Sequence, residues 1–186
     1  MLEEVNANMA VASGLIAGAQ SAVGTKFKNK YTFECYGADG VLKWTEEVYN
    51  IVVNEGLNEI LNKFWKGSTY TAAFYVGLVS ATPTIAAADT MASHVGWTEV
   101  TGYSDATRQA LTLGTVASQS VDNSASKAVF NINATVTVGG AFVTTNNTKG
   151  GTTGVLIGGA AFGAGNRSVI SGDILNVTVT LTAATA

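Results

Sequence analysis

The chain has 186 residues, of which only 12% are Asp, Glu, Lys or Arg, and its net charge at pH 7 is −3. This length suits one domain with a core of its own, with or without an arm. The acidic balance argues against nucleic acid as a main partner, because phosphate binding needs a basic surface.

The N-terminal segment is rich in small residues and has no clear hydrophobic period. Residues 1–25 could not bury enough apolar surface to order themselves alone. We therefore predict an N-terminal arm over residues 1–28, flexible when free and ordered on a partner, with an ordinary frayed terminus as the alternative. The chain starts with acidic rather than basic residues and has no run of about 18 apolar residues, so we expect neither an export signal nor a membrane span.

The only basic cluster is formed by Lys26, Lys28 and Lys30. Three alternating lysines are more typical of a solvated edge strand than of a binding patch. We therefore expect no nucleic-acid site here.

Residues 31–50 carry the pattern of a β-hairpin. Tyr31, Phe33 and Cys35 alternate with other residues along one face, as in a strand with one buried side. The dipeptide at 39–40 is Asp-Gly, a strong signal for a tight turn, because glycine tolerates the positive φ that such turns need.

Residues 54–66 carry the pattern of an α-helix. Asn54 is a suitable N-cap, Glu55 lies where the helix dipole favours a negative charge, and Gly67 can supply a left-handed stop. Five apolar residues recur at the spacing of one helix face, and we expect this stripe to pack on the core. They are Leu57, Ile60, Leu61, Phe64 and Trp65.

Beyond the helix the chain turns to strands. Residues 71–80 are mostly apolar, as in a strand buried on both faces, and shorter candidates lie at 96–103 and 154–162. Apolar residues alternate with Asn and Thr through 128–138 and 175–182. This period of two predicts antiparallel sheet with one face in a core.

These elements together predict a mainly β fold: an antiparallel β-sandwich or jelly-roll-like barrel with one short α-helix and an extended N-terminal arm. Residues 29–186 would form a single domain that includes the hairpin and the helix. The scarcity of charge indicates either that other chains cover much of its surface or that it is simply an uncharged, small-residue β-protein. Neutral Asn and Thr faces can be covered at lower desolvation cost than charged ones, which suits an assembly surface.

The sequence holds no motif that predicts catalysis. Asp89 and Glu99 each lie five residues from His94, the only histidine, but a metal site of this kind is a weak prediction beside an ordinary loop histidine. Cys35 is the only cysteine and is expected to be buried and inert. Four glycines lack the spacing of a phosphate-binding loop and are interpreted as bends between strands: Gly158, Gly159, Gly163 and Gly165. We therefore predict no catalytic, cofactor-binding or metal-binding residue and no enzymatic activity.

The chain resembles virion proteins of tailed bacteriophages. In these an N-x-V-x-N-x-G-L helix start leads to a Y-x-G-L strand and then to a D-T…W-x-E…Y…R segment. The matching residues are Asn50, Val52, Asn54, Gly56, Leu57, Tyr75, Gly77, Leu78, Asp89, Thr90, Trp97, Glu99, Tyr103 and Arg108. The later stretch SASKAVFNINATVTVGGAFVTT is similar to the same group, and the resemblance spans roughly residues 31–182. These motifs are structural rather than catalytic, and they imply a part of a virion.

The resemblance implies a capsid decoration (cement) protein or, as the alternative, a tail, collar or head-fibre subunit. We expect the first, with the major capsid protein and neighbouring copies of itself as partners and with neither nucleic acid nor membrane. A fibre subunit would predict a repeat or coiled coil, and no heptad run is present beyond the helix. A carbohydrate-binding module or hydrolase would need clustered aromatics with acidic partners, whereas Trp44, Trp65 and Trp97 are dispersed.

Overall fold

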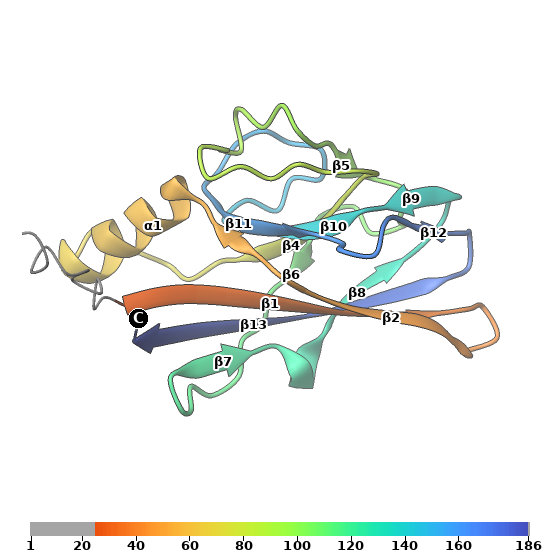
Figure 1. Ribbon diagram of the computed structural model, residues 1–186, viewed down its shortest axis with the longest axis horizontal. Coiled ribbons are helices and arrows are strands. Elements are labelled where there is room, and N and C mark those ends of the chain that lie inside the picture. The colour runs from red at the N-terminus through yellow and green to blue at the C-terminus, as the bar shows by residue number, and fades with distance from the viewer. Residues whose placement is uncertain (1–24, 186) are drawn as a thin grey trace, which may run out of the picture.

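Residues 25–185, which the computed structural model describes, form two packed antiparallel sheets with one short helix at one end (Figure 1). This confirms the predicted mainly β class and the antiparallel sandwich. Residues 1–24 of the predicted arm lie outside the described residues. Residues 25–28 belong to the sheet instead, because they already pair with the C-terminal strand.

The first sheet has the order β2-β1-β13-β7, and β8 pairs with another part of β13. Its centre is the pair β1 and β13, which run antiparallel over twelve residues each. The strands are β1 (Thr25–Tyr36), β2 (Leu42–Tyr49), β7 (Ser120–Asp122), β8 (Ala128–Asn131) and β13 (Ile174–Thr185).

The predicted hairpin is confirmed. β1 and β2 pair antiparallel, and Gly40 in the turn between them has a φ of +75°. Tyr31, Phe33 and Cys35 are all fully buried. The predicted strand 175–182 likewise buries Leu175, Val177 and Val179 completely. The period of two therefore identified the buried faces of both central strands.

The second sheet has the order β3-β11-β10-β4-β5, with β6 also paired to β4. A separate two-stranded ribbon joins β9 to β12, and a 3₁₀ turn, η2 (Ser124–Ser126), precedes β8. The strands are β3 (Ile51–Val52), β4 (Tyr75–Val79), β5 (Glu99–Val100), β6 (Gln109–Ala110), β9 (Val136–Val138), β10 (Gly140–Thr144), β11 (Leu156–Ala161) and β12 (Arg167–Val169).

The second sheet is buried on both faces. Its inner face packs on the first sheet around residues such as Leu78 and Val143. Its outer face is covered by residues 80–98, which contribute Ile85, Met91 and Trp97 to a second apolar cluster (Figure 1). The predicted double burial of the strand within 71–80 is thus confirmed for β4.

Three strand predictions need correction. The predicted strand 128–138 is two strands in different sheets, β8 and β9, because the chain leaves the first sheet after Asn131 and Ala134 is exposed. The predicted strand 96–103 is reduced to β5. Gly158 and Gly159 are not bends but lie inside β11, where a Cβ on Gly158 would come within 2.6 Å of the Ile51 carbonyl oxygen of β3.

The predicted helix is present but does not pack as expected. α1 (Asn54–Ile60) continues into a π-helical turn, η1 (Leu61–Trp65), and Val53 rather than Asn54 is the N-cap. Gly67 has the expected positive φ, +64°. No helix among the described residues is long and apolar enough to cross a bilayer.

The prediction of a core-facing stripe is wrong for four of its five residues, while the fifth, Ile60, is half-buried. Leu57, Leu61, Phe64 and Trp65 are all exposed, because the helix lies at the end of the sandwich rather than across a sheet face (Figure 1). Its close contact with the body is made near its start, where a Cβ on Gly56 would meet the Ile157 carbonyl oxygen of β11 at 2.3 Å.

Candidate functional site

The three residues considered for a metal site, Asp89, His94 and Glu99, each contact other side chains of the fold. The His94 ring stacks on Trp97 with 3.8 Å between ring centroids, and its Nδ1 lies 3.1 Å from the Trp97 carbonyl oxygen. Asp89 accepts a hydrogen bond of 2.9 Å from Trp97 Nε1 and another from the Ala86 amide. Glu99 is paired with Arg108. Among the described residues no group of three or more His, Cys, Asp or Glu side chains could hold a metal ion.

Several residues of the phage-like pattern turn out to form these same contacts. The hydrogen bond between Asp89 and Trp97 joins two parts of the segment after β4, and the pair Glu99–Arg108 joins β5 to the residue that precedes β6. The Phe142 ring packs against Gly77, and a Cβ on Gly77 would lie only 2.3 Å from this ring. These residues of the pattern therefore serve the folding of this chain.

Cys35 is buried in the first sheet, as predicted. Burial raises the pKa of its thiol to about 11, and the Asp173 carboxylate adds to the rise. A thiol at neutral pH is a poor nucleophile. The side chain packs in the core rather than offering a reactive group.

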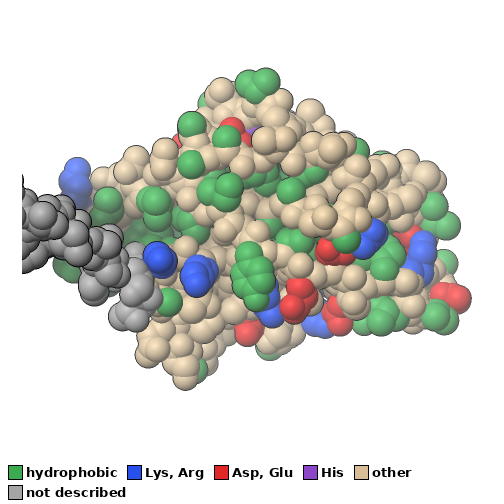
Figure 2. Space-filling view, viewed as in Figure 1, with side chains coloured by type: hydrophobic (Ala, Val, Ile, Leu, Met, Phe, Trp, Pro, Cys, Tyr) green, Lys and Arg blue, Asp and Glu red, His purple; other side chains and the backbone are tan. Residues whose placement is uncertain are grey.

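The predicted edge character holds for Lys26 and Lys28 but not for Lys30, which lies between two paired strands. β2 pairs with β1 only from Lys30 onward, and Lys26 and Lys28 lie before that point. Lys30 forms a 2.9 Å ion pair with Glu47 of β2. In Figure 2 charged side chains of both signs gather in a band over β1 and β2, whereas the part of this face above the band is mostly neutral.

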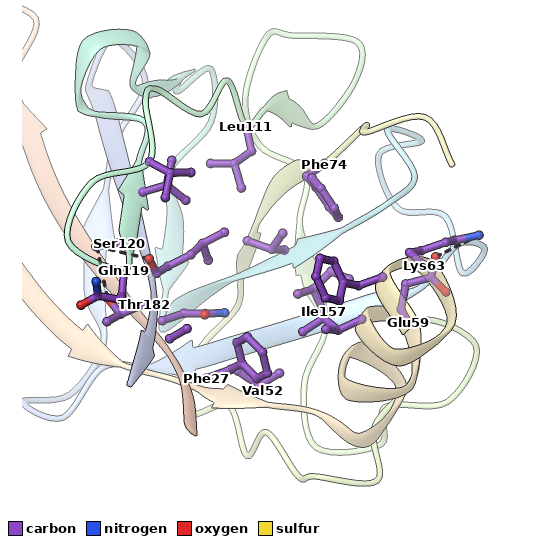
Figure 3. Close-up of a pocket in the computed structure, with 18 of the residues that line it drawn as sticks. Phe27, Val52, Glu59, Lys63, Phe74, Leu111, Gln119, Ser120, Ile157 and Thr182 are labelled. Atoms are coloured by element: carbon purple, nitrogen blue, oxygen red, sulfur yellow. Dashed lines mark hydrogen bonds and ion pairs between the residues drawn. The ribbon is translucent and has the colours of Figure 1, made fainter. Parts of the chain in front are cut away.

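An apolar groove of about 440 Å³ opens at the helix end of the sandwich (Figure 3). It is the unfilled end of the space between the two sheets, since its floor includes Val143 and Ile157, which also belong to or pack against the main core. The helix forms one wall through Ile60 and Phe64, and β1 forms another through Phe27. We call this cavity the apolar groove.

The polar groups of the apolar groove are few. Glu59 and Lys63 lie on its helix wall and form an ion pair with each other at 3.7 Å. Asn29 also lines it, only 5% of its surface is exposed, and its Nδ2 has no hydrogen-bond partner among the described residues. The other polar residues of the lining are Tyr70, Gln119, Ser120 and Thr182. A mostly apolar cavity with a few polar groups is typical of a binding site.

The helix also carries an exposed apolar surface, which shares Phe64 with the apolar groove. We call it the helix-end patch, and it consists of Leu57, Leu61, Phe64 and Trp65. The exposed fractions of Phe64 and Trp65 are 76% and 75%, and the two rings meet edge to face with 5.3 Å between centroids.

Sequence reasoning missed the apolar groove because its lining comes from many separate segments. One signal was present. The inward-facing period of β1 continues before Tyr31 through Asn29 and Phe27, so the odd-numbered positions already indicated a core face inside the predicted arm.

Comparison with models of known protein families gives no match, and a search of curated proteins finds no relative of this chain.

Proposed function

We propose that this chain is a structural virion protein, which binds and stabilises an assembled phage capsid as a decoration or cement protein. The observation that carries the proposal is the helix-end patch. Exposed clusters of large apolar side chains mark sites of protein interaction, and aromatic residues, tryptophan above all, dominate the binding energy of such sites.

The distribution of charge supports an apolar mode of attachment. Residues 67–186 carry nine charged side chains. Five of these nine are held in ion pairs: Glu99, Arg108, Lys127, Arg167 and Asp173. Little free charge remains on this part of the chain, so a partner would be held through apolar burial and neutral hydrogen bonds.

The partner in this proposal is the outer face of a shell built from the major capsid protein, with neighbouring copies of this chain beside it. The resemblance to tailed-phage virion proteins supports that assignment. A protein that binds only the assembled shell stabilises it by mass action, by about 2.7 kcal/mol per site at a hundredfold excess over the dissociation constant.

Thermal melting of particles with and without the chain tests the proposal. Particles that carry the chain should melt at a higher temperature, and electron microscopy should place it on the shell surface. The test variant is Trp65→Ser in the helix-end patch. Its matched control is Val95→Ser, at a side chain that is 99% exposed and lies outside the patch. Equal melting temperatures, together with density for the chain on the tail, would reject the decoration role in favour of a tail or fibre subunit.

A further inference from the structure

We propose that the apolar groove is the docking site for the chain's own N-terminal segment, within residues 5–23. The inference concerns the free protein and does not depend on the proposed function. It differs from the expectation of an arm that stays flexible until a partner is bound.

The position of the segment supports this assignment. β1 begins at Thr25, and Phe27, two residues later on the same strand, lines the apolar groove. The start of β1, the end of β13 and α1 lie at the same end of the molecule (Figure 1). Leu15 and Ile16 precede Thr25 by about ten residues, a span of up to roughly 30 Å when extended. The segment can therefore reach any wall of a groove that begins beside its point of attachment.

The chemistry of the segment matches that of the apolar groove. Residues 5–25 contain no Asp, Glu, Lys or Arg and include Met9, Val11, Leu15 and Ile16. The two charged residues of the lining, Glu59 and Lys63, already neutralise each other. Filling the groove with this segment therefore buries apolar surface without removing an unpaired charge from water.

Asn29 provides an independent observation. Asn29 lines the apolar groove, and its Nδ2 is a buried donor with no acceptor among the described residues. A buried donor without an acceptor is unfavourable. A peptide segment offers one backbone carbonyl oxygen per residue, and one of these accepts the Asn29 hydrogen bond in our proposal.

Because the segment is covalently attached to β1, the groove should bind the chain's own segment in preference to that of a second copy. A short flexible linker gives an effective concentration in the millimolar range, so at about 10 µM protein the intramolecular segment has roughly a hundredfold advantage. The same lining could accept the segment of a neighbour, and the experiment separates the two cases.

Photocrosslinking in the full-length chain tests the proposal. A benzophenone amino acid is placed at Leu15, and a matched probe at Val95 serves as the control, since Val95 is exposed and does not line the groove. Irradiation at micromolar concentration should attach the Leu15 probe to groove peptides such as residues 60–74 or 111–121, within one chain. Mixing ¹⁵N-labelled with unlabelled protein identifies crosslinks between chains.

Two crosslinking outcomes overturn the proposal. Adducts at the groove that mostly join labelled to unlabelled chains would assign the site to a second copy. Groove adducts no more abundant than those of the Val95 control would place the segment elsewhere.

A dye measurement provides an independent check. The double substitution Leu15→Asp with Ile16→Asp should release the segment and raise the fluorescence of 1-anilinonaphthalene-8-sulfonate several-fold, while Val95→Asp should leave it at the wild-type level. Circular dichroism confirms that both variants are folded. Unchanged dye binding in the folded double variant would show that these residues do not cover the apolar groove.

Discussion

Arg108 donates hydrogen bonds to both carboxylate oxygens of Glu99, from Nε at 2.9 Å and from Nη2 at 2.8 Å, and its side chain is completely buried. Nη1 and Nη2 of Arg108 also donate to the carbonyl oxygens of Asn146 and Gly151, respectively. Glu99 also accepts a hydrogen bond from the Gly150 amide. One ion pair thus fastens the loop at 146–151 to the second sheet.

Arg108→Met should therefore be strongly destabilising. Removing one partner of a buried, hydrogen-bonded pair leaves the Glu99 charge uncompensated, which typically costs about 3–5 kcal/mol. Urea denaturation measures the loss. The matched control is Arg167→Met, because Arg167 pairs with Glu46 at 2.7 Å but is partly exposed, and such pairs contribute about 0–1 kcal/mol. Similar losses in the two variants would contradict a special role for burial.

Leu61→Ala should have little effect on stability. Leu61 is 53% exposed on the helix-end patch, and surface substitutions usually change the free energy of unfolding by less than about 0.5 kcal/mol. Leu156→Ala is the matched control at a fully buried position, where the expected cost is about 2–5 kcal/mol. A loss above about 2 kcal/mol for Leu61→Ala would show that this side chain is buried after all, for instance by residues outside the described range.

The helix and the hairpin show what the sequence could and could not predict. The alternation at Tyr31, Phe33 and Cys35 locates a buried face, because a strand in a two-layer sandwich has one side toward the other sheet. The stripe from Leu57 to Trp65 shows equally well that one helix face is apolar. It does not show that a sheet face is free to cover it, and here the loop at 80–98 covers the outer face of the second sheet.

Local sequence patterns also could not predict the position of β10 or the apolar groove. β10 lies at the centre of the second sheet, yet it directly follows β9, and the glycines at 139 and 140 hide the change of sheet. Glycine weakens the period-two signal because it has no side chain to place on either face. The lining of the apolar groove comes from segments far apart in the chain, such as those that contain Phe27 and Leu111. Only tertiary packing brings these together.

The ion pair between Asp173 and Lys43 should make stability sensitive to acid. Asp173 is buried and lies 2.6 Å from Lys43 Nζ. Burial alone would raise the pKa of Asp173, but the hydrogen bonds from Lys43 and the Ile170 amide outweigh it and leave the pKa below its usual value. Because the folded pKa is the lower one, the stabilisation is present above the unfolded pKa of about 3.9 and is lost as the pH falls through the folded pKa.

Denaturation midpoints of the wild type and Asp173→Asn, measured from pH 7 to acid, test this dependence. The stability difference between them should be constant near neutral pH and should shrink below about pH 4. Lys43→Met is the complementary variant. Without the ammonium group, burial of Asp173 should dominate, its pKa should rise, and stability should start to fall at a higher pH than in the wild type. A constant difference at every pH would mean that the carboxylate charge does not carry the stabilisation.

The last prediction concerns how the chain is held on a capsid shell, if the proposed function is right. Trp65→Ser should weaken attachment by about 2 kcal/mol, roughly thirtyfold in the dissociation constant, because a central tryptophan typically carries much of an interface's binding energy. Since the side chain is 75% exposed in the described chain, the fold itself should keep its stability. Val95→Ser should change neither property. Co-sedimentation with particles gives the affinities.

Salt distinguishes this apolar contact from an ionic one. Exposed charges are screened within about 8 Å at physiological ionic strength, so an interface built on ion pairs weakens steeply as salt rises. Attachment through the helix-end patch should hold or strengthen instead. Release between low and moderate salt, with Trp65→Ser bound as tightly as the wild type, would move the contact to the charged band on β1 and β2. Its members are Lys26, Lys28, Lys30, Glu46 and Glu47. In that case the exposed aromatic pair would need a different partner, because burying it elsewhere would still be favourable.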